Sequence, residues 1–105
     1  MGDRGAGGPV PIGRILDEFL ERRGVRLQME RSGVLEEWND KVGESIALVT
    51  RARSVSEATL FVEVRSSAWL MELDLMKGDI LSRVNDGRET GRIDRIVFVL
   101  ADDTA

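Results

Sequence analysis

Two tryptophans, Trp38 and Trp69, are the side chains best suited to recognising another protein. Tryptophan is favoured at the energetic centres of interfaces, and it serves equally well as a large core anchor. Trp69 stands at the start of a predicted helix, where Leu73 and Met76 continue its stripe and Leu70 falls on the outer side. Trp38, Trp69 and Leu70 are therefore our candidate partner-binding residues. Burial in the core is the alternative for both tryptophans.

Five arginines on predicted strands could contact the phosphates of a nucleic acid. They are Arg51, Arg53, Arg65, Arg92 and Arg95. If the strands pair in a suitable register, these side chains gather on one face of a sheet, which suits single-stranded DNA or RNA. The alternative is a solvated face on which nearby glutamates balance the charge.

Catalytic chemistry is limited by the side chains that are missing. The chain has no cysteine, no histidine and no tyrosine. Zinc sites of thiolates or imidazoles and Ser–His or Cys–His nucleophile pairs are thereby excluded. Carboxylates could hold magnesium or act as an acid–base pair, but their spacing indicates neither. The sequence predicts a binding protein that is not an enzyme and uses no cofactor.

Length and composition indicate one small domain. The 105 residues are 42% apolar, enough for one modest core, and the net charge of −4 argues against a generally basic surface. No apolar run reaches the roughly 20 residues that span a bilayer, and the N-terminus has no apolar signal core. We expect a cytoplasmic protein without membrane contact. It divides into a flexible leader (residues 1–11), a domain (12–100) and a short polar tail (101–105).

Helical periodicity precedes the first predicted strand in two segments. Apolar residues recur at i, i+3, i+4, i+7 and i+8 over residues 12–20, which predicts a helix that ends at Gly24. A second helix is predicted over about residues 28–42, with Gly43 as its stop.

Alternation of apolar and polar residues predicts three strands, over residues 48–55, 59–66 and 92–100. The short connection between the first two implies an antiparallel hairpin. The later half of the last strand is apolar on both faces, so we expect it to be central or covered on both sides.

A third helical segment separates the second and third strands. We expect an N-cap at Ser66 or Ser67, a helix from about Ala68 that Gly78 bends or splits, and a loop over residues 85–91. The order α-α-β-β-α-β predicts an α+β, two-layer fold with helices on one face of a small, mostly antiparallel three-stranded sheet. The second and third strands should be parallel if they are adjacent.

Two stretches of this pattern resemble the DciA family of bacterial proteins. Trp38, separated by three residues from Val42-Gly43, matches one family motif, and "VRSSAWLMEL", which starts at Val64, matches a second. The order and spacing of the motifs agree, and the resemblance extends from about residue 12 to residue 100.

The resemblance implies a KH-like fold and a partner. Family members are thought to bind the DnaB-type replicative helicase and to assist its loading or operation in DNA replication. The alternative is a KH-like module that binds DNA or RNA in a different role. KH modules clamp nucleic acid with a Gly-x-x-Gly loop, whereas this chain has Gly78 alone in "MKGDIL". Many family members continue with a basic extension, whereas this chain ends five residues after Leu100 with "ADDTA".

Overall fold

The computed structural model describes the backbone of residues 12–102 and the side chains of residues 21–102. The leader predicted over residues 1–11 lies outside this range, as do residues 103–105 of the predicted tail. The side chains of the apolar stripe predicted over residues 12–20 also lie outside it. The elements follow in the order α1 (Ile12–Ser32), α2 (Val34–Val42), α3 (Glu44–Ala47), β1 (Thr50–Ser56), β2 (Thr59–Val64), α4 (Ser67–Leu75), α5 (Lys77–Asn85) and β3 (Arg95–Leu100).

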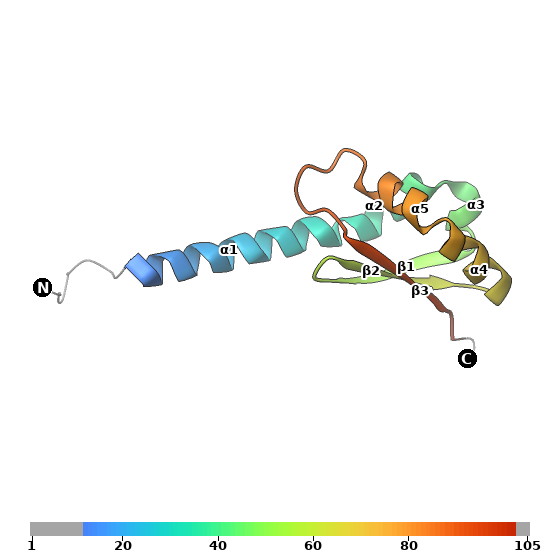
Figure 1. Cartoon of the computed structure of the whole chain (residues 1–105), viewed down its shortest axis with the longest axis horizontal. Helices are drawn as coiled ribbons and strands as arrows, with labels where there is room; N and C mark the ends of the chain where they lie inside the picture. Colours follow the sequence, from blue (N-terminus) through green and yellow to red (C-terminus); the bar gives the residue numbers. More distant parts are fainter. Residues whose placement is uncertain (1–11, 103–105) are drawn as a thin grey trace, which may run out of the picture.

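The strands form one sheet in the order β1-β2-β3, with the helical layer on one of its faces (Figure 1). β1 and β2 are an antiparallel hairpin, and β2 and β3 are parallel. The parallel pair is possible because α4 and α5 carry the chain back to the end of the sheet at which β2 begins. The predicted α+β, two-layer architecture is confirmed, and its sheet is mixed.

The core lies between the sheet and the helices that cover it. β2 alternates strictly, so that Leu60, Val62 and Val64 are fully buried while Phe61 and Glu63 face the other way. The remaining buried apolar residues come from α2, α3, α4, α5, the loop before β3, and β3: Val34, Trp38, Val42, Ile46, Leu73, Ile80, Val84, Ile93, Ile96 and Phe98.

The boundary between the first two helices differs from the prediction. α1 runs through Gly24 to Ser32, and the break falls at Gly33. A glycine inside a helix costs up to about 1 kcal/mol, which neighbouring turns easily offset. A tertiary contact accompanies the break at Gly33: the Arg88 guanidinium donates to the Glu30 carbonyl (2.8 Å). Its Nη2 also lies 3.6 Å from the place that a Cβ of Gly33 would occupy. Arg88 therefore donates a hydrogen bond to a backbone carbonyl in the last turn of α1, that of Glu30.

The structure also differs from the prediction at α3 and at the break between α4 and α5. Residues 44–47, which lie between the predicted stop at Gly43 and the predicted first strand, form the short helix α3. The third helical segment does split, but at Met76 (φ −102°, ψ 9°), two residues before Gly78.

β3 is an edge strand, so the prediction that its later half is central or covered on both sides is wrong. It begins at Arg95, three residues later than expected. Ile96 and Phe98 are buried under the helices, whereas Val99 is 41% and Leu100 51% exposed. Apolar side chains on both faces of a strand do not distinguish a central strand from an uncovered edge.

α1 extends away from the sheet, as Figure 1 shows. Its described apolar side chains contribute nothing to the buried core, and Val25 and Met29 are exposed. Within residues 12–102, no helix is long and apolar enough to cross a membrane.

Candidate partner-binding groove

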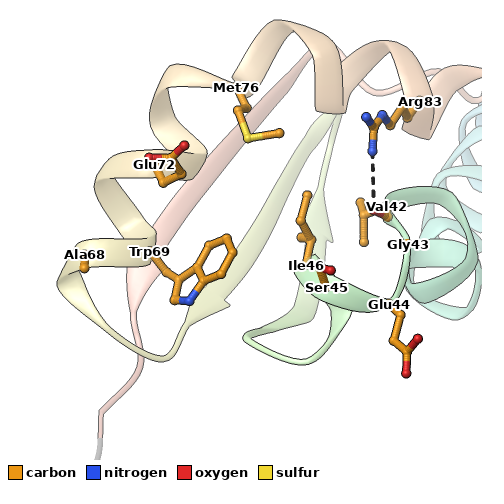
Figure 2. A pocket seen from close by; sticks show the side chains of 10 residues that line it. All are labelled: Val42, Gly43, Glu44, Ser45, Ile46, Ala68, Trp69, Glu72, Met76 and Arg83. Atoms are coloured by element: carbon orange, nitrogen blue, oxygen red, sulfur yellow. Dashed lines mark hydrogen bonds between the residues drawn. The ribbon is translucent and has the colours of Figure 1, made fainter.

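The two motifs singled out in the sequence meet at one open groove, shown in Figure 2. The end of α2 and the start of α3 form one wall, and α4 and the following helix form the other. The groove has a volume of about 640 Å³. Its lining residues are Val42, Gly43, Glu44, Ser45, Ile46, Ala68, Trp69, Glu72, Met76 and Arg83.

Gly43 gives the first wall its shape. Its backbone angles, φ 89° and ψ 165°, lie in a region that only glycine adopts without strain. The Gly43 N–H donates to the Asn39 carbonyl (3.1 Å), and its own carbonyl accepts from the Ala47 N–H (2.9 Å). One residue thus closes α2 and opens α3, as the sequence predicted for the end of the helix.

Ser66 sets the direction of the second wall. It is extended (φ −140°, ψ 157°), and its Oγ accepts a hydrogen bond from the Trp69 backbone N–H (3.3 Å). This is the N-cap arrangement, typically worth about 1 kcal/mol. The cap fixes the first turn of α4, so that the Trp69 side chain enters the groove toward Ile46 and Ser45 (Figure 2).

Trp69 combines the two roles that the sequence left open. Its side chain is half-buried and packs against the core cluster, and it also lines the groove. No residue in the described part of the chain accepts a hydrogen bond from its indole N–H. A half-exposed ring with an available donor suits recognition of another protein.

The other two partner-binding candidates lie at different depths. Trp38 is 1% exposed. Its Nε1 donates to Thr50 Oγ1 (2.9 Å), which in turn donates to the Ile46 carbonyl (2.7 Å). The Trp38 side chain is therefore not accessible to a partner protein, and it could affect binding only through the residues that it positions. Leu70 is half-buried against the core, although the sequence placed it on the outer side of the helix. It is not among the residues that line the groove.

The far end of the groove is polar. The Arg83 guanidinium donates to the Val42 carbonyl (3.4 Å) and pairs with Asp79 (3.1 Å). Glu72 stands on the rim, and the Glu44 side chain points away from Trp69 in Figure 2. An apolar floor of Trp69, Met76 and aliphatic side chains with a few polar groups at its rim suits an apolar side chain of a protein partner.

The sheet does not gather the five arginine candidates into one cluster. Arg51 faces Glu63 across the hairpin and Arg95 faces Thr59, so the two share the uncovered face but lie toward opposite ends of β2. Arg53 occupies a bulge in β1, where its Nε lies 3.5 Å from Glu63 Oε2. Glu63 thus offsets part of the positive charge on this face.

The remaining two candidates lie outside the strands. Arg65 is exposed, one residue beyond β2, and its backbone N–H donates to the Val49 carbonyl (3.0 Å). Arg92 is in the loop before β3, where its Nη1 donates to the Arg88 carbonyl (2.9 Å) and its own carbonyl accepts from Arg31 Nε (3.2 Å). Arg92 therefore sits beside the end of α1, away from the open face.

A basic surface that the sequence analysis did not single out lies on α1. Arg22, Arg23 and Arg26 are exposed and, with Leu27, Glu30 and Thr90, line a hollow of about 540 Å³. Arg22 and Arg26 are four residues apart, which places them on one side of a helix. The spacing was visible in the sequence, but the expected stop at Gly24 separated them. Among the described residues, no group of three or more Asp, Glu, His or Cys side chains could hold a metal ion.

Comparison with known proteins places these features in a family. The family model for DciA, described as "Dna[CI] antecedent, DciA", matches residues 11–98. That range contains α1, both motifs and the first four of the six residues of β3.

Curated relatives cover the same part of the chain. A UPF0232 protein of Mycobacterium tuberculosis is 29% identical over 76 residues, which is 72% of this chain and 41% of that protein. A UPF0232 protein of Corynebacterium glutamicum is 31% identical over 74 residues, 70% of this chain and 42% of that protein. This chain therefore spans about two-fifths of the length of the curated relatives it matches. With a family match over most of its length, the chain belongs to the DciA family.

Proposed function

We propose that this chain is a non-enzymatic module that binds the DnaB-type replicative helicase and assists its loading or operation, with the groove around Trp69 as its docking site. Family membership supports a role in replication. The observation that carries the choice of site is that both motifs line one groove, although Gly43 and Trp69 are far apart in the sequence.

The physical character of the groove is consistent with this use. Trp69 offers a ring and an indole N–H that has no acceptor among the described residues, and the neighbouring walls are fixed by the Ser66 cap and the Gly43 turn. A partner side chain that enters the groove would desolvate an aromatic anchor that is already in place, so little conformational entropy is lost on binding.

The test is co-elution of the purified chain with the DnaB-type helicase from the same genome. Ala68 is exposed and lines the groove, so Ala68→Arg obstructs it without removing a core side chain. We expect Ala68→Arg to abolish co-elution. Trp69→Phe keeps a ring but removes the N–H donor, and it should weaken binding by roughly 2- to 10-fold.

Ser82→Arg is the matched control, because Ser82 is exposed on α5 and does not line the groove. It should bind as the unmodified chain does, with a similar melting curve. If the unmodified chain fails to co-elute at low micromolar concentration, the helicase role is wrong. If Ala68→Arg co-elutes normally while the unmodified chain binds, the role stands and the groove is not the docking site.

The open face of the sheet supports a second candidate function, which is binding of single-stranded DNA or RNA. No helix of the described range covers this face, which carries Phe61 between Arg51 and Arg95, a combination suited to base stacking and phosphate contact. Arg51→Gln with Arg95→Gln should weaken binding of an oligonucleotide and reduce its salt dependence. Arg92→Gln, which removes a charge away from this face, should change binding less. Equal effects of the two changes would contradict a site on the open face.

A further inference from the structure

The outer edge of β3 is an uncovered row of backbone hydrogen-bonding groups. The Arg95 N–H donates to the Ala58 carbonyl (3.3 Å) and the Ala101 N–H to the Val64 carbonyl (2.7 Å). Peptide groups alternate in direction along a strand, so the odd-numbered residues of β3 face β2. The backbone groups that face outward belong to Ile96, Phe98 and Leu100. Within the described range, no other residue forms a hydrogen bond with them.

Apolar side chains flank this edge on the helical side and on the open side. Val99 and Leu100 are exposed on β3. On α4, which packs beside β3, Met71 is 71% and Leu75 86% exposed. Figure 1 shows β3 along the near side of the sheet with no helix in front of it. A regular apolar strand with a bare edge is a template for pairing with another strand.

The opposite edge of the sheet is protected against such pairing. β1 carries a bulge between Ala52 and Ser54, and the bulged residue is Arg53. Arg51 adds a second charge, and the Gln28 side chain of α1 donates to the Val55 carbonyl (3.1 Å). Bulges and charged side chains are the usual devices that prevent pairing at an edge. β3 has neither device: its register with β2 is regular, and its only charged residue is its first, Arg95.

We propose that β3 pairs with β3 of a second copy of this chain, so that two three-stranded sheets join into one. A two-fold axis perpendicular to the sheet makes the two strands antiparallel and places both helical layers on the same side. The residues of β3 after Arg95 are uncharged, so they can face their own copy without like-charge repulsion, whereas β1 carries both Arg51 and Arg53. On the helical side, Met71 and Leu75 of each copy would then lie next to the interface between the two β3 strands. This inference does not depend on the helicase role.

Sedimentation of the full chain from about 10 µM to about 1 mM tests the proposal, because a six-residue edge is small for a stable interface and association should depend on concentration. We expect a shift from one chain to two. Leu100→Pro removes an outward N–H and no bond to β2, and Val99 before it is already extended, so the fold should tolerate it. Leu100→Lys introduces a charge at the edge. Each should weaken dimerisation by at least about 10-fold.

Leu48→Lys makes the same change at another exposed leucine, away from β3, and should leave dimerisation unchanged. Hydrogen exchange gives a second measurement at single residues. The amides of Ile96, Phe98 and Leu100 should become protected as concentration rises, whereas those of Val97 and Val99 are protected throughout. A chain that stays monomeric to about 1 mM overturns the proposal. So does dimerisation that both Leu100 variants retain, or protection of the outward amides that appears only when another protein is added.

Discussion

Trp38→Ala is expected to lower the free energy of unfolding by about 3–5 kcal/mol, a large part of the about 5–15 kcal/mol that holds a small domain folded. Trp38 is the largest fully buried side chain of the described range and joins three elements. Its ring packs in the core from α2, and its N–H reaches Thr50 of β1, whose hydroxyl continues to the Ile46 carbonyl in α3. Urea unfolding followed by far-ultraviolet circular dichroism measures the loss.

Two comparisons separate the packing of Trp38 from its hydrogen bond. Trp38→Phe keeps most of the apolar volume, and the Thr50 hydroxyl still donates to Ile46, so we expect a smaller loss of about 1–3 kcal/mol. Trp69→Ala, at the half-exposed tryptophan, should also cost less than Trp38→Ala because part of its ring already contacts water. A Trp38→Ala variant within about 1 kcal/mol of the unmodified chain would contradict the central place given to this side chain.

Asn85→Ala is the second change with a large expected effect, about 2–5 kcal/mol. Asn85 is the buried polar residue of the described core, and its amide pairs with both backbone groups of Ile93: Nδ2 donates to the Ile93 carbonyl and Oδ1 accepts from the Ile93 N–H, each at 2.8 Å. Removing the amide leaves a donor and an acceptor without partners beside the fully buried Ile93 side chain. The unfolding free energy, again from urea titration, is the quantity to compare.

The chain provides a matched control one residue away. Asp86 is exposed, and its hydrogen bonds within the described range are made by its backbone: its N–H donates to the Arg83 carbonyl (3.2 Å), and its carbonyl accepts from Lys41 Nζ (2.6 Å). Asp86→Ala should therefore stay within about 0.5 kcal/mol. Asn85→Asp at neutral pH keeps the acceptor but sets a carboxylate against the Ile93 carbonyl, so it should destabilise at least as much as Asn85→Ala. Equal stability of the Asn85 and Asp86 variants would show that the amide bridge contributes little.

The sequence predicted well wherever a local signal decides the structure. Alternation placed Leu60, Val62 and Val64 on the buried face of β2, and the serine cap before Trp69 is present at Ser66. Gly43 ends its helix because its backbone angles suit no other residue. Each of these follows from a few neighbouring residues, and each fixes part of the groove.

The errors arise where a distant residue decides. Gly24 is the predicted helix stop, yet α1 ends at Ser32, next to the contact between Arg88 and the Glu30 carbonyl, which are 58 residues apart along the chain. Val99 and Leu100 suggested a covered strand, and only the strand order shows that they lie on an edge. Asn85 looked like an ordinary loop residue, because its partner Ile93 lies across the loop. The convergence of the two motifs on one groove is likewise a property of the tertiary fold.

Because α1 is long, a small change in its direction at Gly33 would move its far end by a large distance. A helix of this length extends about 30 Å from its pivot, so a change of about 10° in its direction displaces its far end by about 5 Å. That direction is held by a few polar contacts at the base: Arg88 on the Glu30 carbonyl, Arg31 on the Arg92 carbonyl, and Gln28 on the Val55 carbonyl. Two of these three contacts are made by residues of the loop before β3, so a change in the position of this loop would displace the far end of α1 more than its base.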